Sequence, residues 1–158
     1  MEFQFNDGGR EAAGFKGMTG DCVTRAITIA TGKPYAEVYN ALWSGIREYR
    51  DSRRDRVARR MQRGGGRKGT TPRNGVSPKV YRPYLEGLGW RWHPTMQIGS
   101  GCKVHLKKEE LPTGRLIVSV SKHMLAVIDG VIQDTYKDDR GGTRCVYGYF
   151  APYAASPI

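Results

Sequence analysis

A cysteine near the start of this 158-residue chain stands where a thiol can become a nucleophile. Cys22 opens a segment whose apolar residues recur at helical spacing, and Asp21 before it is a favourable N-cap residue. A thiol in the first turn of a helix meets unpaired backbone N–H groups and the positive end of the helix dipole, and both favour the thiolate. Cys22 is therefore our candidate nucleophile, and its backbone N–H is a candidate donor to an oxyanion. Considered locally, it could equally be a small apolar core residue.

A hairpin late in the chain could supply a base for this thiol. Segments 123–129 and 131–136 are rich in β-branched and aromatic residues, and Asp129-Gly130 between them is a strong signal for a two-residue turn. The two segments should be antiparallel neighbours. Asp129 itself belongs to the turn, six residues along the strand from His123.

The same turn sets the register by counting, because it pairs Ile128 with Val131. His123 then faces Tyr136, and Asp134 is its diagonal neighbour on the same face, within reach of the imidazole. We predict His123 as the general base and Asp134 as the carboxylate that orients it. A buried histidine paired with an acid for structural reasons is the alternative.

Other arrangements are weaker. Asp138, the other diagonal neighbour of His123, is the reserve choice for the orienting acid. Cys102 in a glycine-rich turn, with His105 three residues later, is a rival thiol and base, but residues three apart on a strand point to opposite faces. His93 is expected to be a surface or packing residue.

Cysteine usage suggests reduced thiols. Cys22, Cys102 and Cys145 are an odd number without CxxC spacing, which argues against a disulfide framework and against a zinc site. We expect no cofactor and no metal. The first residues show neither a basic start followed by an apolar run nor a cleavage site, and no apolar run reaches membrane-spanning length, so we expect a soluble, cytoplasmic protein without a secretory leader.

Positive charge is concentrated in one part of the chain. The net charge is +11, and between Arg47 and Arg82 thirteen Lys/Arg face three acids. Residues 47–76, which include a run of glycines, are predicted to form a basic, mobile insert. Such an insert could attract an acidic protein or bind nucleic acid non-specifically.

Helices are predicted early in the chain and strands late. The helix that starts at Cys22 should be followed by a second one from Pro34 and, after the insert, by one opened by Ser77 and bent or shortened by Pro83. Strands are predicted at 115–121, 123–129, 131–136 and 143–150. The whole, residues 1–158, is expected to be a single α+β domain with N-terminal helices packed on a C-terminal antiparallel sheet.

Two motifs carry a resemblance to a known family: GDCVTRAITIATGKPY (20–35) and KHMLAVIDGVIQDTY (122–136). They resemble papain-like cysteine peptidases, especially the C39-like proteins of bacteria and their phages. The resemblance implies a papain-like fold, a peptide or protein substrate, and the roles of nucleophile, base and orienting acid for Cys22, His123 and Asp134.

The resemblance has departures that leave other functions open. Such peptidases usually keep an oxyanion-hole glutamine about six residues before the cysteine, where this chain has Lys16; Gln4 and Asn6 are amides further upstream. The Asp-Cys pair is also similar to that of NlpC/P60 amidases, which cleave cell-wall peptides. The sequence therefore predicts a cysteine peptidase or isopeptidase, with a cell-wall amidase or a binding module on an inactive hydrolase fold as alternatives.

Overall fold

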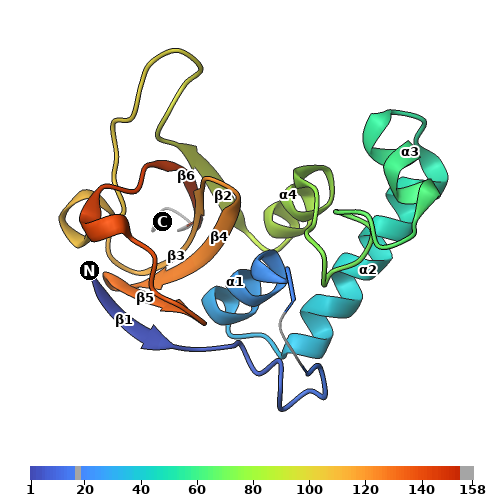
Figure 1. Cartoon of the computed structure of the whole chain (residues 1–158), viewed down its shortest axis with the longest axis horizontal. Coiled ribbons are helices and arrows are strands. Elements are labelled where there is room, and N and C mark those ends of the chain that lie inside the picture. Colours follow the sequence, from blue (N-terminus) through green and yellow to red (C-terminus); the bar gives the residue numbers. More distant parts are fainter. Residues whose placement is uncertain (17–18, 154–158) are drawn as a thin grey trace, which may run out of the picture.

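The computed structural model describes residues 1–16 and 19–153. Within them, four α-helices lie beside one six-stranded sheet (Figure 1). The elements are β1 (Glu2–Phe5), α1 (Cys22–Thr31), α2 (Tyr35–Ser52), α3 (Arg56–Arg63), α4 (Pro78–Gly87), β2 (Trp90–Pro94), β3 (Arg115–Val120), β4 (His123–Ile128), β5 (Val131–Asp134) and β6 (Val146–Pro152), with 3₁₀ turns η1 (Lys108–Glu110) and η2 (Arg140–Gly142). The α+β class is therefore confirmed.

Helix α1 begins at Cys22, as the sequence predicts, and is buried along almost its whole length. It lies between the sheet and the other helices, packed on β4 and β3 on one side and on α2 on the other. Gly32 ends it with a left-handed φ of 74°, and its N–H donates to the carbonyl of Thr28. The nucleophile candidate is thus carried by the element that joins the two halves of the molecule.

The sheet has the strand order β1-β5-β4-β3-β6-β2. Strands β4 and β5 pair in the predicted register, with Ile128 opposite Val131, and both turn residues, Asp129 and Gly130, have positive φ as a type I′ turn requires. The prediction of a purely antiparallel sheet is wrong at one edge, because β1 pairs with β5 in parallel. Strands β1 and β2 were not predicted. β1 alternates Phe3 and Phe5 with polar residues, but it is only four residues long and exposed along its length, so the pattern is too short to predict a strand.

Apolar side chains fill both faces of the sheet. One core joins α1, α2 and α4 to residues such as Ile117, Ala126 and Phe150. The other lies on the opposite face, beneath the long connection 95–114, and contains Leu106 and Leu116. Because β4 is covered on both sides, its first residue, His123, is held at the end of a rigid strand.

The segment expected to be a mobile insert is folded onto the helices. Its first part completes α2, its middle forms α3, and Ala58, Met61 and Val76 are buried. The loop 64–77 then runs back from α3 towards α1 (Figure 1), where Thr24 Oγ1 donates to the carbonyl of Pro72 at 2.9 Å. The end of the basic segment is therefore hydrogen-bonded to α1, the helix that begins at Cys22.

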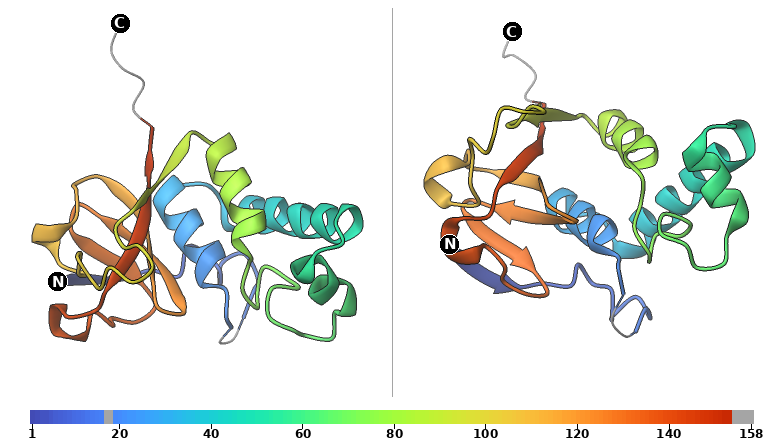
Figure 2. Two further views of the ribbon diagram at one scale, coloured as in Figure 1. Left: turned by 90° about the horizontal axis from the view of Figure 1, so that it is seen from above. Right: turned by 45° about the horizontal axis from the view of Figure 1, so that its top comes forward.

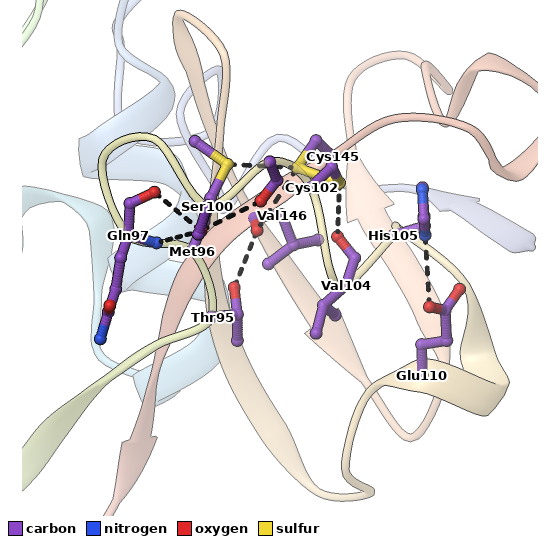
Figure 3. The surroundings of a disulfide bond; sticks show 11 residues. Thr95, Met96, Gln97, Ser100, Cys102, Val104, His105, Glu110, Cys145 and Val146 are labelled. Atoms are coloured by element: carbon purple, nitrogen blue, oxygen red, sulfur yellow. Dashed lines mark hydrogen bonds and ion pairs between the residues drawn. A yellow bond between two sulfur atoms is a disulfide. The ribbon is translucent and has the colours of Figure 1, made fainter.

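A disulfide joins Cys102 to Cys145, with their Cα atoms 5.8 Å apart (Figure 3). The expectation of reduced thiols is wrong for this pair, which joins positions 43 residues apart. Cys22 is the free cysteine. Among residues 1–16 and 19–153, no helix has both the length and the apolar character needed to cross a membrane.

Candidate active site

The three residues predicted for chemistry lie together. Cys22 is the first residue of α1, His123 the first of β4 and Asp134 the last of β5. His123 Nε2 lies 2.6 Å from Asp134 Oδ2. Cys22 and His123 line the same cleft, and their interaction lowers the pKa of the thiol and raises that of the imidazole. The packing of α1 on β4 and the register of the hairpin thus bring a thiol, an imidazole and a carboxylate into one row.

The contacts of the imidazole assign its two nitrogen atoms. Because Nε2 is hydrogen-bonded to Asp134, Nδ1 is the nitrogen that remains for the thiol. Tyr136, the residue predicted to face His123, places its hydroxyl 3.4 Å from Nδ1 and its ring centroid 5.2 Å from the imidazole. The reserve acid, Asp138, instead accepts a hydrogen bond from Arg144 at 2.7 Å. Asp134, and not Asp138, is therefore the carboxylate that contacts His123.

A buried arginine outside the three predicted site residues, Arg25, holds Asp134 in place. Arg25 Nη2 donates to Asp134 Oδ1 at 3.0 Å, and Arg25 Nη1 donates to Asp21. Arg25 is 4% exposed, Asp21 0% and Asp134 3%. The backbone N–H of Thr135 adds a third bond to Asp134, at 2.7 Å. Both carboxylate oxygens of Asp134 are occupied, so its orientation towards His123 is fixed.

Asp21 is the N-cap residue of α1, as the sequence predicts, but its side chain is engaged elsewhere. Its side chain accepts no hydrogen bond from the first turn. It turns instead to Arg25, to Arg10 at 3.0 Å and to the hydroxyl of Tyr35 at 2.7 Å. Among the described residues, the backbone N–H groups of 22–24 have no acceptor. These groups are therefore free to receive a developing negative charge beside the thiol.

The charges around the thiol shift the ionisation of the site. Burial alone would raise the pKa of Cys22, but the bond to His123, its charge and Arg25 outweigh burial, so that the pKa of the thiol is lowered. Burial alone would lower the pKa of His123, yet Asp134 and Cys22 raise it to about 9. The pKa of Asp134 is lowered because His123 and Arg25 outweigh its burial. The site therefore favours a thiolate beside an imidazolium more strongly than a free cysteine and a free histidine would.

A cleft of about 1320 Å³ opens above Cys22. One wall comes from the hairpin, with His123 and Tyr136, and the other from α3 and the loop 64–77, with Met61 and Lys68. Within the described part of the chain, no Asp or Glu lines this cleft. Its volume exceeds that of typical small-molecule pockets, and much of its lining is apolar, so it suits an extended chain.

The three upstream residues considered for an oxyanion hole lie outside the cleft. Gln4 and Asn6 both bind the side chain of Gln133, at 3.0 and 3.2 Å, where β1 meets β5. The carbonyl of Lys16 accepts from Arg73 at 2.9 Å. The donors that the structure offers beside Cys22 are thus the backbone N–H groups of α1.

The rival site is not assembled. Cys102 is bonded to Cys145, and His105 lies beside Glu110, with Nδ1 3.2 Å from the carboxylate (Figure 3). His93 is on β2 and stacks on Tyr149 with ring centroids 5.1 Å apart, which agrees with a packing role.

One sequence signal pointed to Arg25. It is the single charged residue between Asp21 and Lys33, in a helix that is otherwise apolar or carries only hydroxyl groups. A charge on a buried helix requires a partner. A buried Arg25 needs at least one acidic partner, and Asp21, one helical turn earlier, is the partner that the sequence suggests. The sequence does not identify the second partner, Asp134, which is distant along the chain.

Comparisons with known proteins found no match: no protein family, no curated protein and no solved structure is similar to this chain.

Proposed function

We propose that this protein is a cysteine hydrolase of the papain-like kind that cleaves an amide bond in a peptide or protein. The observation that carries the proposal is the meeting of Cys22, His123 and Asp134: His123 Nε2 lies 2.6 Å from Asp134 Oδ2, and Cys22 and His123 line one cleft together. Its support comes from the first turn of α1, which offers uncapped N–H groups next to the sulfur, and from the open cleft above it.

The reaction follows from these positions. The Cys22 thiolate attacks the carbonyl carbon, and the resulting oxyanion accepts hydrogen bonds from the N–H groups of α1. The intermediate collapses when the C–N bond breaks and His123 gives its proton to the leaving amine, which leaves a thioester on Cys22. Water then attacks the thioester while His123 takes its proton. The carboxylic acid product departs, and the thiolate and imidazolium are restored.

Asp134 and Arg25 act through His123 rather than on the substrate. Asp134 keeps Nε2 protonated and the ring turned so that Nδ1 faces the sulfur. Arg25 holds the second oxygen of Asp134 at 3.0 Å and prevents the carboxylate from rotating. Protein amides, isopeptides and cell-wall peptides all present the same carbonyl group, so the substrate panel for this enzyme includes all three.

Alkylation of Cys22 with iodoacetamide tests the proposal without a known substrate. At about pH 6 an ordinary thiol is almost fully protonated, so a thiolate stabilised by His123 should react at least ~10-fold faster than Cys22 in the urea-unfolded chain. Replacement His123→Ala should remove this advantage. His93→Ala is the matched control and should leave the rate unchanged. Equal rates for the folded and unfolded wild-type protein would overturn the proposal.

A further inference from the structure

A second hollow, of about 770 Å³, lies around α3 next to the active-site cleft. Its lining contains seven basic residues and one acid. These residues are Arg54, Asp55, Arg56, Arg59, Arg60, Arg63, Arg67 and Lys68. Figure 1 shows α3 at the end of the molecule far from the sheet, with the loop 64–77 returning from it towards α1. The hollow thus gathers most of the positive charge of the basic segment at one place.

These positive charges lack partners in the protein. Within residues 1–16 and 19–153, none of the seven forms an ion pair. The one acid, Asp55, is used locally: it accepts from the N–H of Ala58 at 2.9 Å and from the hydroxyl of Tyr49. An anion entering the hollow would therefore meet guanidinium groups with no competing carboxylate of the protein.

The arrangement of the arginines opposes helix formation. Arg56, Arg59, Arg60 and Arg63 stand three or four residues apart on α3, where like charges repel. The helix forms because Asp55 caps it and because Ala58 and Met61 on its other face are buried. A bound anion would relieve the repulsion, so the hollow fits a ligand that brings several negative charges.

The hollow and the cleft share two residues. Arg60 and Lys68 line both, while Met61, next to Arg60, lines only the cleft. Figure 2 shows, in both of its views, α1 between the sheet and α3, with the returning loop on the side of α3. A single extended ligand can therefore lie along the cleft and continue into the hollow without crossing an acidic barrier.

We propose that the hollow around α3 is a substrate subsite, which binds a run of Asp or Glu side chains in a polypeptide whose scissile amide lies at Cys22. The inference rests on the proposed function, because the link to Cys22 makes the ligand a polypeptide. Carboxylates match the fork of the guanidinium group. Nucleic acid fits less well, because the hollow holds no aromatic side chain on which bases could stack.

A binding experiment with the full-length Cys22→Ala protein tests the subsite. The probe is a fluorescein-labelled peptide with a run of glutamates, compared with the same peptide carrying glutamines. We expect the glutamate peptide to bind at least ~10-fold more tightly, and the double replacement Arg59→Glu/Arg63→Glu to abolish the difference. Arg47→Glu/Lys79→Glu is the matched control: it changes the charge equally within the basic segment, outside both hollows, and should leave the difference within about twofold.

A protection experiment tests the connection to Cys22. In the wild-type protein the glutamate peptide should slow alkylation of Cys22 by iodoacetamide, and Arg59→Glu/Arg63→Glu should lose this protection while its alkylation without peptide is unchanged. Arg59→Gln/Arg63→Gln should give the same result and guards against misfolding of the charge-reversed protein. Single-stranded DNA that binds as tightly as the peptide but gives no protection would overturn the inference.

The two proposals fail in different ways. Fast alkylation of Cys22 together with equal binding of the glutamate and glutamine peptides overturns the subsite and leaves the proposed hydrolase. Alkylation of Cys22 that is equally slow in the folded and the unfolded protein overturns the proposed hydrolase. It also overturns the substrate subsite, even if the glutamate peptide binds to the protein.

Discussion

Two clusters of charge in this protein lie close together and are built in opposite ways. Beneath Cys22, Arg25 is 4% exposed and its guanidinium group binds both Asp21 and Asp134. Around α3, seven exposed basic residues face one acid that is already engaged. The first cluster has its counter-charges inside the fold, and the second lacks them. A buried cluster of this kind fixes geometry, whereas an exposed and uncompensated one is suited to bind a ligand.

The difference has an energetic cause. Ions removed from water are destabilising unless partners replace their hydration, so a buried network tolerates no missing member. Exposed arginines stay hydrated, and mutual repulsion costs α3 only a few tenths of a kcal/mol for each pair, on the order of 0.2–0.5 kcal/mol. Replacements in the two clusters should therefore affect different properties.

The largest effect is expected for Arg25→Met. The replacement leaves Asp21 and Asp134 buried without the cation that they share, which should lower the free energy of unfolding by about 3–5 kcal/mol. Urea denaturation followed by circular dichroism measures this change. Arg63→Met on α3 is the matched control. Equal stability of the two variants would show that the two clusters do not differ as described.

The pH dependence of stability should distinguish Cys22→Ala from the wild-type protein. His123 has a pKa of about 9 when folded, against about 6.5 in the unfolded chain, so its contribution is complete below about pH 6.5 and is lost as the pH rises through about 9. Cys22 has a lowered pKa, so its contribution grows over the same range and opposes that loss. The wild-type curve should be flatter than that of Cys22→Ala, in which only the loss remains.

Urea midpoints between about pH 6 and 9 measure the two curves. The double replacement Cys22→Ala/His123→Ala is the control and should remove the downward slope of the single variant. Parallel curves for the wild type and Cys22→Ala would mean that the thiolate and the imidazolium are not paired.

A smaller loss of stability is expected for Tyr35→Phe. Its hydroxyl donates to Asp21 at 2.7 Å, and burial with this bond raises the pKa of Tyr35. Tyr35→Phe removes one bond to a charged acceptor while Arg10 and Arg25 remain, so the unfolding free energy should fall by about 1–3 kcal/mol. Tyr39→Phe in the next helical turn is the control. A loss as large as that of Arg25→Met would mean that Tyr35, and not Arg25, holds the network together.

The smallest effect is expected for Arg59→Gln, which removes a charge from α3. It should raise the unfolding free energy by no more than about 0.5 kcal/mol, because the repulsion between Arg59 and the neighbouring arginines of α3 is removed. Differential scanning calorimetry at low salt measures the change. A clear loss of stability would show that Arg59 supports the fold, and the contrast between the two clusters would then be weaker.

Local rules account for much of the site. The start of α1 at Cys22 follows from apolar periodicity, and the meeting of His123 with Asp134 follows from a two-residue turn and the alternation of side chains along a strand. The parallel edge strand β1 and the bond between Cys102 and Cys145 escaped prediction, because both depend on where distant parts of the chain return.

The contents of the basic segment were visible in the sequence, but its place was not. Thirteen basic residues between Arg47 and Arg82 predict attraction to anions wherever they lie. Their position beside the cleft depends on the burial of Ala58 and Met61 against α2 and on the bond between Thr24 and the carbonyl of Pro72. These are long-range contacts that periodicity cannot reveal.

By itself, therefore, the sequence determined the chemical groups of this protein: a thiol at a helix start, an imidazole diagonal to a carboxylate, and a concentrated positive charge. The tertiary structure decided how they are combined. It brought Cys22 to His123 by packing α1 on β4, placed Arg25 between two acids, and set the arginines of α3 beside the cleft. Backbone geometry acts between near neighbours and can be counted along the chain, whereas the pairing of buried charges depends on which distant elements exclude water together.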